Sequence, residues 1–296
     1  MASSPSPESR STVRPYRPED ESSVRDLIDA DRLPGQPHWV PGQPAAQRSG
    51  AAPLCGWAAP ARPRISVLAD AGDRARGIVA YLCWADVRTG LICRLHAREN
   101  PPALRALVCH ALGALAHCLR VEAFVGAPAD AWGLVGLPRT RRAATHGALV
   151  QSGFTGRRQG CYLHRSLPAE VPSAKVVADV LPCEMPPGRR LVIREAAEPV
   201  AEAVVTVGPD RTAAIHWIET LPSRRRRGLA RLLLGQALTL LAEEGVTDVS
   251  AVLDDAQQRS PGTAAASRLF DSFGFTFVDD LWGYQHQRPR ATRGDA

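Results

Sequence analysis

A run of four arginines followed by a glycine is the part of this sequence best suited to chemistry. It lies within residues 221–230, which read Leu-Pro-Ser-Arg-Arg-Arg-Arg-Gly-Leu-Ala. Positive side chains at a helix start oppose the helix dipole, so the arrangement is locally unfavourable unless an anion binds. A glycine lets the backbone N–H groups approach a phosphate, and Arg225, Arg226 and Arg227 can add charge-assisted hydrogen bonds. The segment therefore predicts a phosphate site, and the alternative is a solvated basic helix start.

A predicted strand leads into this segment, and a predicted helix leaves it. Residues 213–221 are strand-like, and residues 228–244 carry apolar side chains at helical spacing until Gly245. A helix that starts directly after a strand presents its exposed N–H groups at one spot. The other elements expected in this half are strands over residues 190–195, 200–207, 248–253 and 275–286 and a helix over residues 263–272.

The first half of the chain repeats this order of elements. Residues 152–154 (Ser-Gly-Phe) correspond to residues 273–275 (Phe-Gly-Phe), and residues 162–164 (Tyr-Leu-His) correspond to residues 284–286 (Tyr-Gln-His). These matches at corresponding points indicate an internal duplication. The elements expected here are strands over residues 13–15, 65–68, 77–84, 90–96, 121–125 and 154–164, a helix from Pro101 capped by Asn100, and a helix over residues 145–152.

The basic loop has no counterpart in the first half. Residues 98–103 take its place, and they contain no glycine, an added acid and two prolines without N–H groups. We therefore expect only the second half to bind a phosphorylated ligand.

The spacing Arg225-x-x-Gly228-x-Ala230 resembles the coenzyme A pyrophosphate loop of the GNAT acyltransferases, (Gln/Arg)-x-x-Gly-x-(Gly/Ala). The resemblance covers residues 190–289 well and the first half weakly, and the arrangement is similar to that of tandem, mycothiol synthase-like proteins. It implies an α/β fold with two tandem GNAT-like domains, each a mixed, mostly antiparallel sheet flanked by helices. It also implies acetyl-CoA as cosubstrate, held by Ile218, Thr220, Leu221, Arg225, Arg226, Arg227, Gly228, Leu229 and Ala230.

In that family the strand before the loop aligns the thioester and then separates from the next strand, here residues 248–253. The pantetheine arm would lie between the two strands, and a backbone N–H would stabilise the oxyanion of the tetrahedral intermediate. Many members also carry a tyrosine that protonates the leaving thiolate. Phe270 stands at that position here and cannot donate a proton. Tyr284 is the candidate substitute, and the alternative is an ordinary strand tyrosine.

The amine acceptor must lose a proton before or during its attack. Glu219 is the first candidate for the base because it is the one carboxylate within the aligning strand. Glu219 could equally anchor the substrate or take no part in the reaction. His216 is the second candidate, since a histidine titrates near neutral pH. Strand alternation predicts that these two side chains point to opposite faces.

The composition narrows the function further. The formal net charge is +6, but Lys175 is the only lysine, and abundant Ala, Arg, Pro and Gly indicate GC-rich coding rather than a nucleic-acid surface. Seven cysteines without a C-x-x-C motif, and histidines without ligand spacing, predict a reducing cytoplasm with no disulfide framework and no metal site. No signal peptide and no run of membrane-spanning length is present, so we expect no membrane partner.

The chain is expected to divide into a disordered start (1–12), a degenerate GNAT-like domain (13–167), a linker (168–189), an acetyl-CoA-binding GNAT domain (190–289) and a tail (290–296). The predicted activity is transfer of acetyl from acetyl-CoA to an amine of a small molecule. The first domain and the 33–64 loop, with Trp39 and Trp57, would shape the substrate cleft. The alternatives are a protein N-terminal or lysine acetyltransferase and a non-catalytic acyl-CoA-binding regulator, the latter favoured by Phe270.

Overall fold

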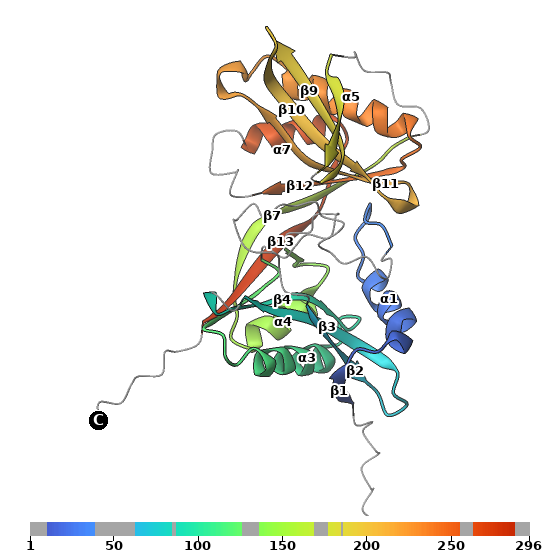
Figure 1. Cartoon of the computed structure of the whole chain (residues 1–296), viewed down its shortest axis with the longest axis vertical. Coiled ribbons are helices and arrows are strands. Elements are labelled where there is room, and N and C mark those ends of the chain that lie inside the picture. Colours follow the sequence, from blue (N-terminus) through green and yellow to red (C-terminus); the bar gives the residue numbers. More distant parts are fainter. Residues whose placement is uncertain are drawn as a thin grey trace, which may run out of the picture.

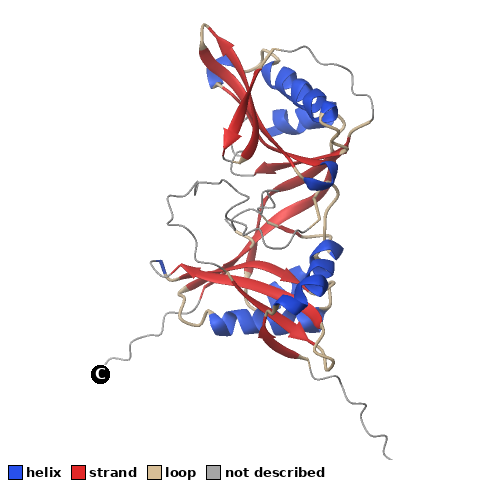
Figure 2. Cartoon of the chain, turned by 45° about the vertical axis from the view of Figure 1, so that its right-hand side comes forward, coloured by secondary structure: helices blue, strands red, loops and turns tan. Residues whose placement is uncertain are grey.

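The computed structural model describes residues 11–38, 63–84, 87–125, 136–168, 177–184, 186–254 and 263–287. Its strands form one 13-stranded sheet. Figures 1 and 2 show this sheet running along the molecule, with helices gathered at both ends. We name these two ends the N-terminal lobe and the C-terminal lobe.

The N-terminal lobe is built from the first half of the chain. Its first four strands pair antiparallel, and the fourth and fifth pair parallel. The Asn100 side chain accepts a hydrogen bond from the Ala103 N–H at 3.0 Å and caps α3, as predicted. The elements are β1 (Thr12–Pro15), β2 (Arg64–Ala69), β3 (Ala75–Trp84), β4 (Thr89–His96), β5 (Arg120–Ala123), α1 (Glu21–Ala30), α3 (Pro101–Ala114) and α4 (Ala143–Gln151).

The C-terminal lobe has the same strand pattern, antiparallel over four strands and then parallel. Its elements are β8 (Asp179–Glu184), β9 (Pro187–Glu195), β10 (Glu198–Val207), β11 (Thr212–Thr220), β12 (Asp248–Asp254), α5 (Leu229–Glu243) and α7 (Thr263–Ser272). β8 and the start of β9 lie within residues 168–189, which the sequence indicated as a linker. β8 is an edge strand, where a residue such as Pro182 is tolerated.

Each lobe has its own hydrophobic core under its longest helix. The apolar positions of α3 and α5 recur at steps of three and four residues, so they fall on one helix face. Fully burying one leucine contributes about 1.5–3 kcal/mol, so these faces hold each helix on its sheet. The buried residues are Leu104, Leu107, Val108 and Ala111 in α3 and Leu233, Leu234, Ala237, Leu238 and Leu241 in α5.

The last strand of each half pairs with the other lobe. β7 (Thr155–Ser166), from the first half, pairs with β12, while β13 (Thr276–Gln287), from the second half, pairs with β5 and with the short β6 (Leu137–Pro138). β7 and β13 also pair with each other and cross the middle of the molecule (Figure 1). The two halves therefore share one continuous sheet, which the predicted domain boundaries did not anticipate.

The cores confirm this exchange of strands. Cys161, Leu163 and Leu167, which precede the predicted linker, pack into the core of the C-terminal lobe. Tyr284, near the end of the chain, packs into the core of the N-terminal lobe. Each core is therefore completed by residues from the other half.

A β-bulge stands at the same place in both lobes. The parallel pairing of β4 with β5 ends at Ile92, and that of β11 with β12 ends at Ile215. The next residue in each strand, Cys93 or His216, has no register partner on the preceding antiparallel strand. The duplication inferred from the sequence is thus repeated in the backbone.

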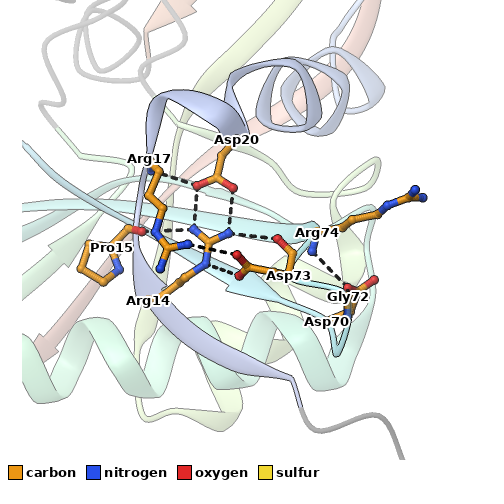
Figure 3. A network of polar contacts seen from close by, with 8 residues as sticks. All are labelled: Arg14, Pro15, Arg17, Asp20, Asp70, Gly72, Asp73 and Arg74. Atoms are coloured by element: carbon orange, nitrogen blue, oxygen red, sulfur yellow. Dashed lines mark hydrogen bonds and ion pairs between the residues drawn. The ribbon is translucent and has the colours of Figure 1, made fainter.

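Ion pairs tie the N-terminal strand to the lobe (Figure 3). Arg14 of β1 bonds both carboxylate oxygens of Asp20, at 2.7 and 2.9 Å, and also Asp73 in the β2–β3 turn at 2.6 Å. The Arg14 guanidinium lowers the pKa of the buried Asp20 carboxyl. This network fixes the start of α1 against the edge of the sheet. None of the described helices is long and apolar enough to cross a bilayer.

Candidate active site

The arginine-glycine segment forms an exposed turn between β11 and α5. Residues Pro222–Arg224 form η4, one turn of 3-10 helix, and α5 begins directly after Gly228. Gly228 has a φ of +77°, a left-handed conformation that strains any residue with a Cβ. A Cβ built there meets no atom within 4 Å, so the backbone faces open space. A ligand can therefore approach the backbone at this point.

The turn has the electrostatic character of an anion site. The first N–H groups of α5 have no intrahelical acceptor, and the positive end of the helix dipole lies among them. Glu195 pairs with Arg224 at 2.9 Å and with Arg227 at 3.4 Å. No carboxylate of a described residue pairs with Arg225 or Arg226. These two arginines therefore leave positive charge at the turn for a ligand to neutralise.

A gap opens between β11 and β12 on the way to this turn. Their pairing stops at Ile215 and Ala251, although β11 continues to Thr220 and β12 to Asp254. Backbone groups of β11 beyond the bulge therefore lack a partner strand on this side. Among the described residues, the buried Thr220 hydroxyl also has no hydrogen-bond partner. An extended ligand could pair with this edge of β11, in the position that the resemblance implied for the pantetheine arm.

The bulge at His216 changes the face on which its side chain lies. The predicted opposite orientation of His216 and Glu219 is wrong, because the bulge adds a residue and breaks the alternation. Ile218 packs into the core under α5, so the neighbouring Glu219 points to the other face. The His216 Nε2 lies 2.8 Å from the Thr206 hydroxyl, on that same other face.

This face carries an aromatic ring and two carboxylates. Glu219 lies opposite Glu202 of β10 in the strand register, is exposed, and forms no ion pair with a described residue. The Trp217 indole N–H donates to Glu202 at 3.4 Å, and Arg190 also pairs with Glu202. We call Glu202, Trp217 and Glu219 the acidic face. A ring beside carboxylates suits a protonated amine.

His216 is poorly suited to act as a base. Burial lowers the pKa of its imidazole to about 4, so the ring is uncharged at neutral pH and binds a proton weakly. Glu219 stays the stronger candidate of the two because its carboxylate is exposed at the end of β11.

Tyr284 lies in the other lobe. It pairs with Ala123 of β5 and Gly156 of β7 and is fully buried. Its hydroxyl oxygen lies 2.8 Å from the His146 Nδ1. Burial raises the pKa of this phenol. The structure therefore does not bring Tyr284 to the turn at Gly228, because β13 carries it across the molecule. Phe270 is buried against Phe275, with ring centroids 5.0 Å apart.

A segment of the N-terminal half reaches the C-terminal lobe. The Tyr162 hydroxyl donates to the Pro34 carbonyl at 2.8 Å, and the His38 N–H donates to Asp210 at 2.9 Å. Residues 33–38 thus run beside the centre of the sheet and approach the lobe that carries the acidic face. Most of the predicted 33–64 loop, with Trp39 and Trp57, lies outside the described residues.

The corresponding gap of the N-terminal lobe is filled by protein. Arg142, just before α4, donates to the Leu95 carbonyl at 2.6 Å. Leu95 stands three residues beyond Ile92, as Ile218 stands three beyond Ile215. Arg142 also pairs with Glu99 at 2.7 Å and with Asp31 at 3.2 Å. A guanidinium therefore bonds the backbone edge that a ligand would need.

Sequence reasoning missed Glu202 and Trp217. Antiparallel pairing of the two predicted strands 200–207 and 213–221 could have placed Glu202 opposite Glu219. The bulge, which sets the final register, left no signal in the sequence. Glu195, which pairs with Arg224 and Arg227, is the last residue of β9 and could not be assigned to the turn without the fold.

Comparison with known proteins agrees with this arrangement. Residues 159–275 match the model of the acetyltransferase (GNAT) family. No curated protein sequence matches the chain. A GCN5-related N-acetyltransferase from Sphaerobacter thermophilus superposes with a TM-score of 0.61 at 14% identity, over 94% of this chain and 96% of that one. The resemblance to the GNAT family is thereby confirmed for residues 159–275, and the superposition shows the same fold over nearly the whole chain.

Two further solved structures share the fold. A tandem GNAT protein from the clavulanic acid biosynthesis pathway has a TM-score of 0.57 at 15% identity, over 95% of this chain and 99% of that one. A glucosamine N-acetyltransferase region of a fungal multi-domain GH3 β-N-acetylglucosaminidase has a TM-score of 0.60 at 12% identity, over 96% of this chain and 39% of that one. The predicted α/β fold with a tandem GNAT arrangement is confirmed over nearly the whole chain.

Proposed function

We propose that this chain is an N-acetyltransferase that moves an acetyl group directly from acetyl-CoA to an amine of a small molecule. The observation that carries the proposal is the exposed Gly228 turn at the start of α5, beside the gap between β11 and β12. The pyrophosphate would accept hydrogen bonds from the N–H groups of Gly228, Leu229 and Ala230 and from Arg225 and Arg226. Arg227 is held in part by Glu195, so its contribution would be smaller.

The gap would hold the pantetheine arm. An extended amide chain there can pair with the edge of β11 over residues 218–221, as a strand would. A β11 N–H would stabilise the negative charge on the carbonyl oxygen during transfer. The carbon–nitrogen bond forms on the thioester carbonyl, and the carbon–sulfur bond breaks to release coenzyme A.

The acidic face would receive the amine. Glu219 would take the proton from the amine, which is charged at neutral pH and must lose a proton to attack. Trp217 and Glu202 would orient the cation beside it. With Phe270 in the core, the leaving thiolate would take its proton from solvent.

The N-terminal lobe would act as a support in this function. Its own gap is closed by Arg142, and its helix α3 starts at two prolines. Pro34, which contacts Tyr162 beside Val252 at the start of the gap, would form part of the wall of the acceptor site, whereas His38 contacts Asp210 at the opposite end of β11. This division of roles would make the C-terminal repeat the active one.

A second candidate function has a specific observation in its favour. Phe270 cannot donate a proton, and Tyr284 lies in the other lobe, so neither is placed to protonate the thiolate. A protein that binds acyl-CoA without turning it over would need no such group. Catalysis and sensing differ in one measurable result, the release of thiol.

Calorimetric titration with acetyl-CoA, followed by thiol release across a panel of small amines, tests the proposal. We expect saturable binding and release of thiol with at least one amine. Glu219→Gln should lower kcat by about 10²-fold or more and leave the coenzyme affinity unchanged, because general-base catalysis contributes about 10²–10⁴-fold. Glu243→Gln, an exposed change at the far end of α5, is the matched control.

The other possible results of these experiments distinguish the two candidate functions and test the coenzyme site separately from the base. Binding without thiol release for every amine favours the regulator. No binding heat from folded protein refutes the coenzyme site. An undiminished rate in Glu219→Gln removes Glu219 as the base and leaves the coenzyme site standing.

A further inference from the structure

Two cysteines and a histidine converge at the edge of the N-terminal lobe that lies at the end of α3. Cys83 is near the end of β3, and His117 and Cys118 lie in the turn between α3 and β5. Their ligand atoms all lie within 4.8 Å of one another, and the Cys83 and Cys118 sulfurs are 3.1 Å apart. Residues so far apart in the sequence give no metal motif, which is why the cysteine spacing predicted no metal.

The backbone that carries these groups is held in place. The Arg88 guanidinium donates to the His117 carbonyl at 3.0 Å, and the Leu119 N–H donates to the Arg88 carbonyl at 2.8 Å. Cys118 is buried, Cys83 is partly buried and His117 is exposed. The three donors therefore lie close together between the interior of the lobe, where Cys118 is buried, and its surface, where His117 is exposed.

We propose that Cys83, His117 and Cys118 bind a zinc ion. Two thiolates and an imidazole are a donor set that zinc takes in tetrahedral sites, and the fourth position would hold water or another small ligand. Two sulfurs bound to one zinc at about 2.3 Å lie roughly 3.8 Å apart, so the cysteines need to separate by less than about 1 Å. The ion would tie the end of β3 to the turn that leads into β5.

The C-terminal lobe supplies an internal comparison. The matched strand registers place Val207 at the position of Cys83, and Gly245 and Val246 at the positions of His117 and Cys118. The fold is therefore stable at this point with apolar residues, and Val246 is buried there. Packing alone does not require two thiols and an imidazole at the edge of the N-terminal lobe.

Cobalt and zinc titrations of the reduced, metal-free full chain test the site. One equivalent of Co²⁺ should produce thiolate charge-transfer absorption and the intense visible bands of tetrahedral cobalt, and Zn²⁺ should displace it. Zinc should also raise the melting temperature, since it binds only the folded site. Cys83→Ser should abolish these signals, and His117→Ala should weaken affinity by about tenfold or more.

Two variants separate metal binding from folding. The double change Cys83→Val and Cys118→Val copies the C-terminal lobe, so it should fold normally and lose the cobalt bands. Cys109→Ser, at an exposed cysteine of α3, should keep them. The proposal is overturned if the parent shows no thiolate–cobalt absorption, if the double variant binds zinc as tightly as the parent, or if thiol counting finds Cys83 and Cys118 joined as a disulfide under reducing conditions.

Discussion

Helices α3 and α5 occupy the same place in the two lobes, but their N-termini are satisfied in different ways. At α3 the Asn100 side chain caps the helix, and Pro101 and Pro102 remove two N–H groups. At α5 the N-cap residue is Gly228, which has no side chain to accept a hydrogen bond from the first N–H groups. The same scaffold is therefore closed at one helix start and left open for a ligand at the other.

The gaps between the strands beside these helices differ in the same way, because the gap is filled in the N-terminal lobe and open in the C-terminal lobe. In the N-terminal lobe Glu99 turns away from α3, bonds Arg142 and accepts two N–H bonds at the start of α4, at 2.7 and 3.0 Å. Arg142 in turn bonds the Leu95 carbonyl in the gap. Charges that would face a ligand in one lobe are thus paired within the protein in the other. Hydrogen bonds within the protein therefore occupy in the N-terminal lobe the positions that stay open in the C-terminal lobe.

Separating the lobes should have the largest effect. Residues 1–167 and 168–296, expressed apart, should each fail to fold, because β5 loses β13 and β12 loses β7, leaving exposed strand edges. Circular dichroism and thermal melts would show the absence of a cooperative transition. Co-expression should recover a soluble complex. A cooperative melt of either half alone would contradict the importance of the strand exchange.

Removing the arginine that fills the N-terminal gap should cost stability. Arg142→Met removes the guanidinium from Glu99 and from the largely buried Asp31, which keeps only His96 as a side-chain partner at 2.7 Å, so we expect a loss of about 3 kcal/mol in the free energy of unfolding. Urea denaturation would measure it. The affinity of the folded variant for acetyl-CoA should stay unchanged. A fall in that affinity would show that the two gaps are not independent.

Blocking the open helix start should abolish coenzyme binding. Gly228→Glu adds a Cβ at a φ of +77° and a negative charge where the pyrophosphate would lie, so the Kd for acetyl-CoA should rise at least about a hundredfold, or about 2.7 kcal/mol. Calorimetry would measure the change. Asn100→Ala removes the cap of α3 instead, and should lower stability by about 1 kcal/mol with no effect on binding. Equal losses of affinity in both variants would refute the comparison.

The bulge residues of the two lobes should respond differently to acid. His216 has a pKa of about 4 when folded and about 6.5 when unfolded, so the unfolded state binds the extra proton. Its stabilising contribution is complete above pH 6.5 and is lost as the pH falls toward 4, by up to about 3 kcal/mol. Denaturation across this range should show a smaller acid loss in His216→Gln than in the parent. Cys93→Ser, at the other bulge, should lose as much unfolding free energy as the parent when the pH falls.

Local features of this fold could be predicted well from the sequence. Helix α5, its glycine cap and the Asn100 cap of α3 follow from residue types at fixed spacing, because capping and helical periodicity act within a few residues. The family resemblance added the separation of β11 and β12, which the strand register confirms. The exposed turn at Gly228 also agrees with the prediction for that segment.

Long-range features could not be predicted in this way. Tyr284 looked like a neighbour of the C-terminal site because it ends the second half of the chain, but β13 crosses into the other lobe. The bulge at His216 reversed the predicted face of its side chain. β8 was not predicted because it lies in a proline-rich segment, and an edge strand tolerates proline.

The sequence by itself determined the repeated order of elements and the start of α5, where arginines precede a glycine N-cap that has no capping side chain. Both depend on residues close together in the chain, where propensity and charge act directly. Only the tertiary structure decided which half completes each core, which gap Arg142 fills, and that Cys83 meets His117 and Cys118. Those outcomes depend on strand pairing and burial between distant residues, whose free energies exist only once the sheet has formed.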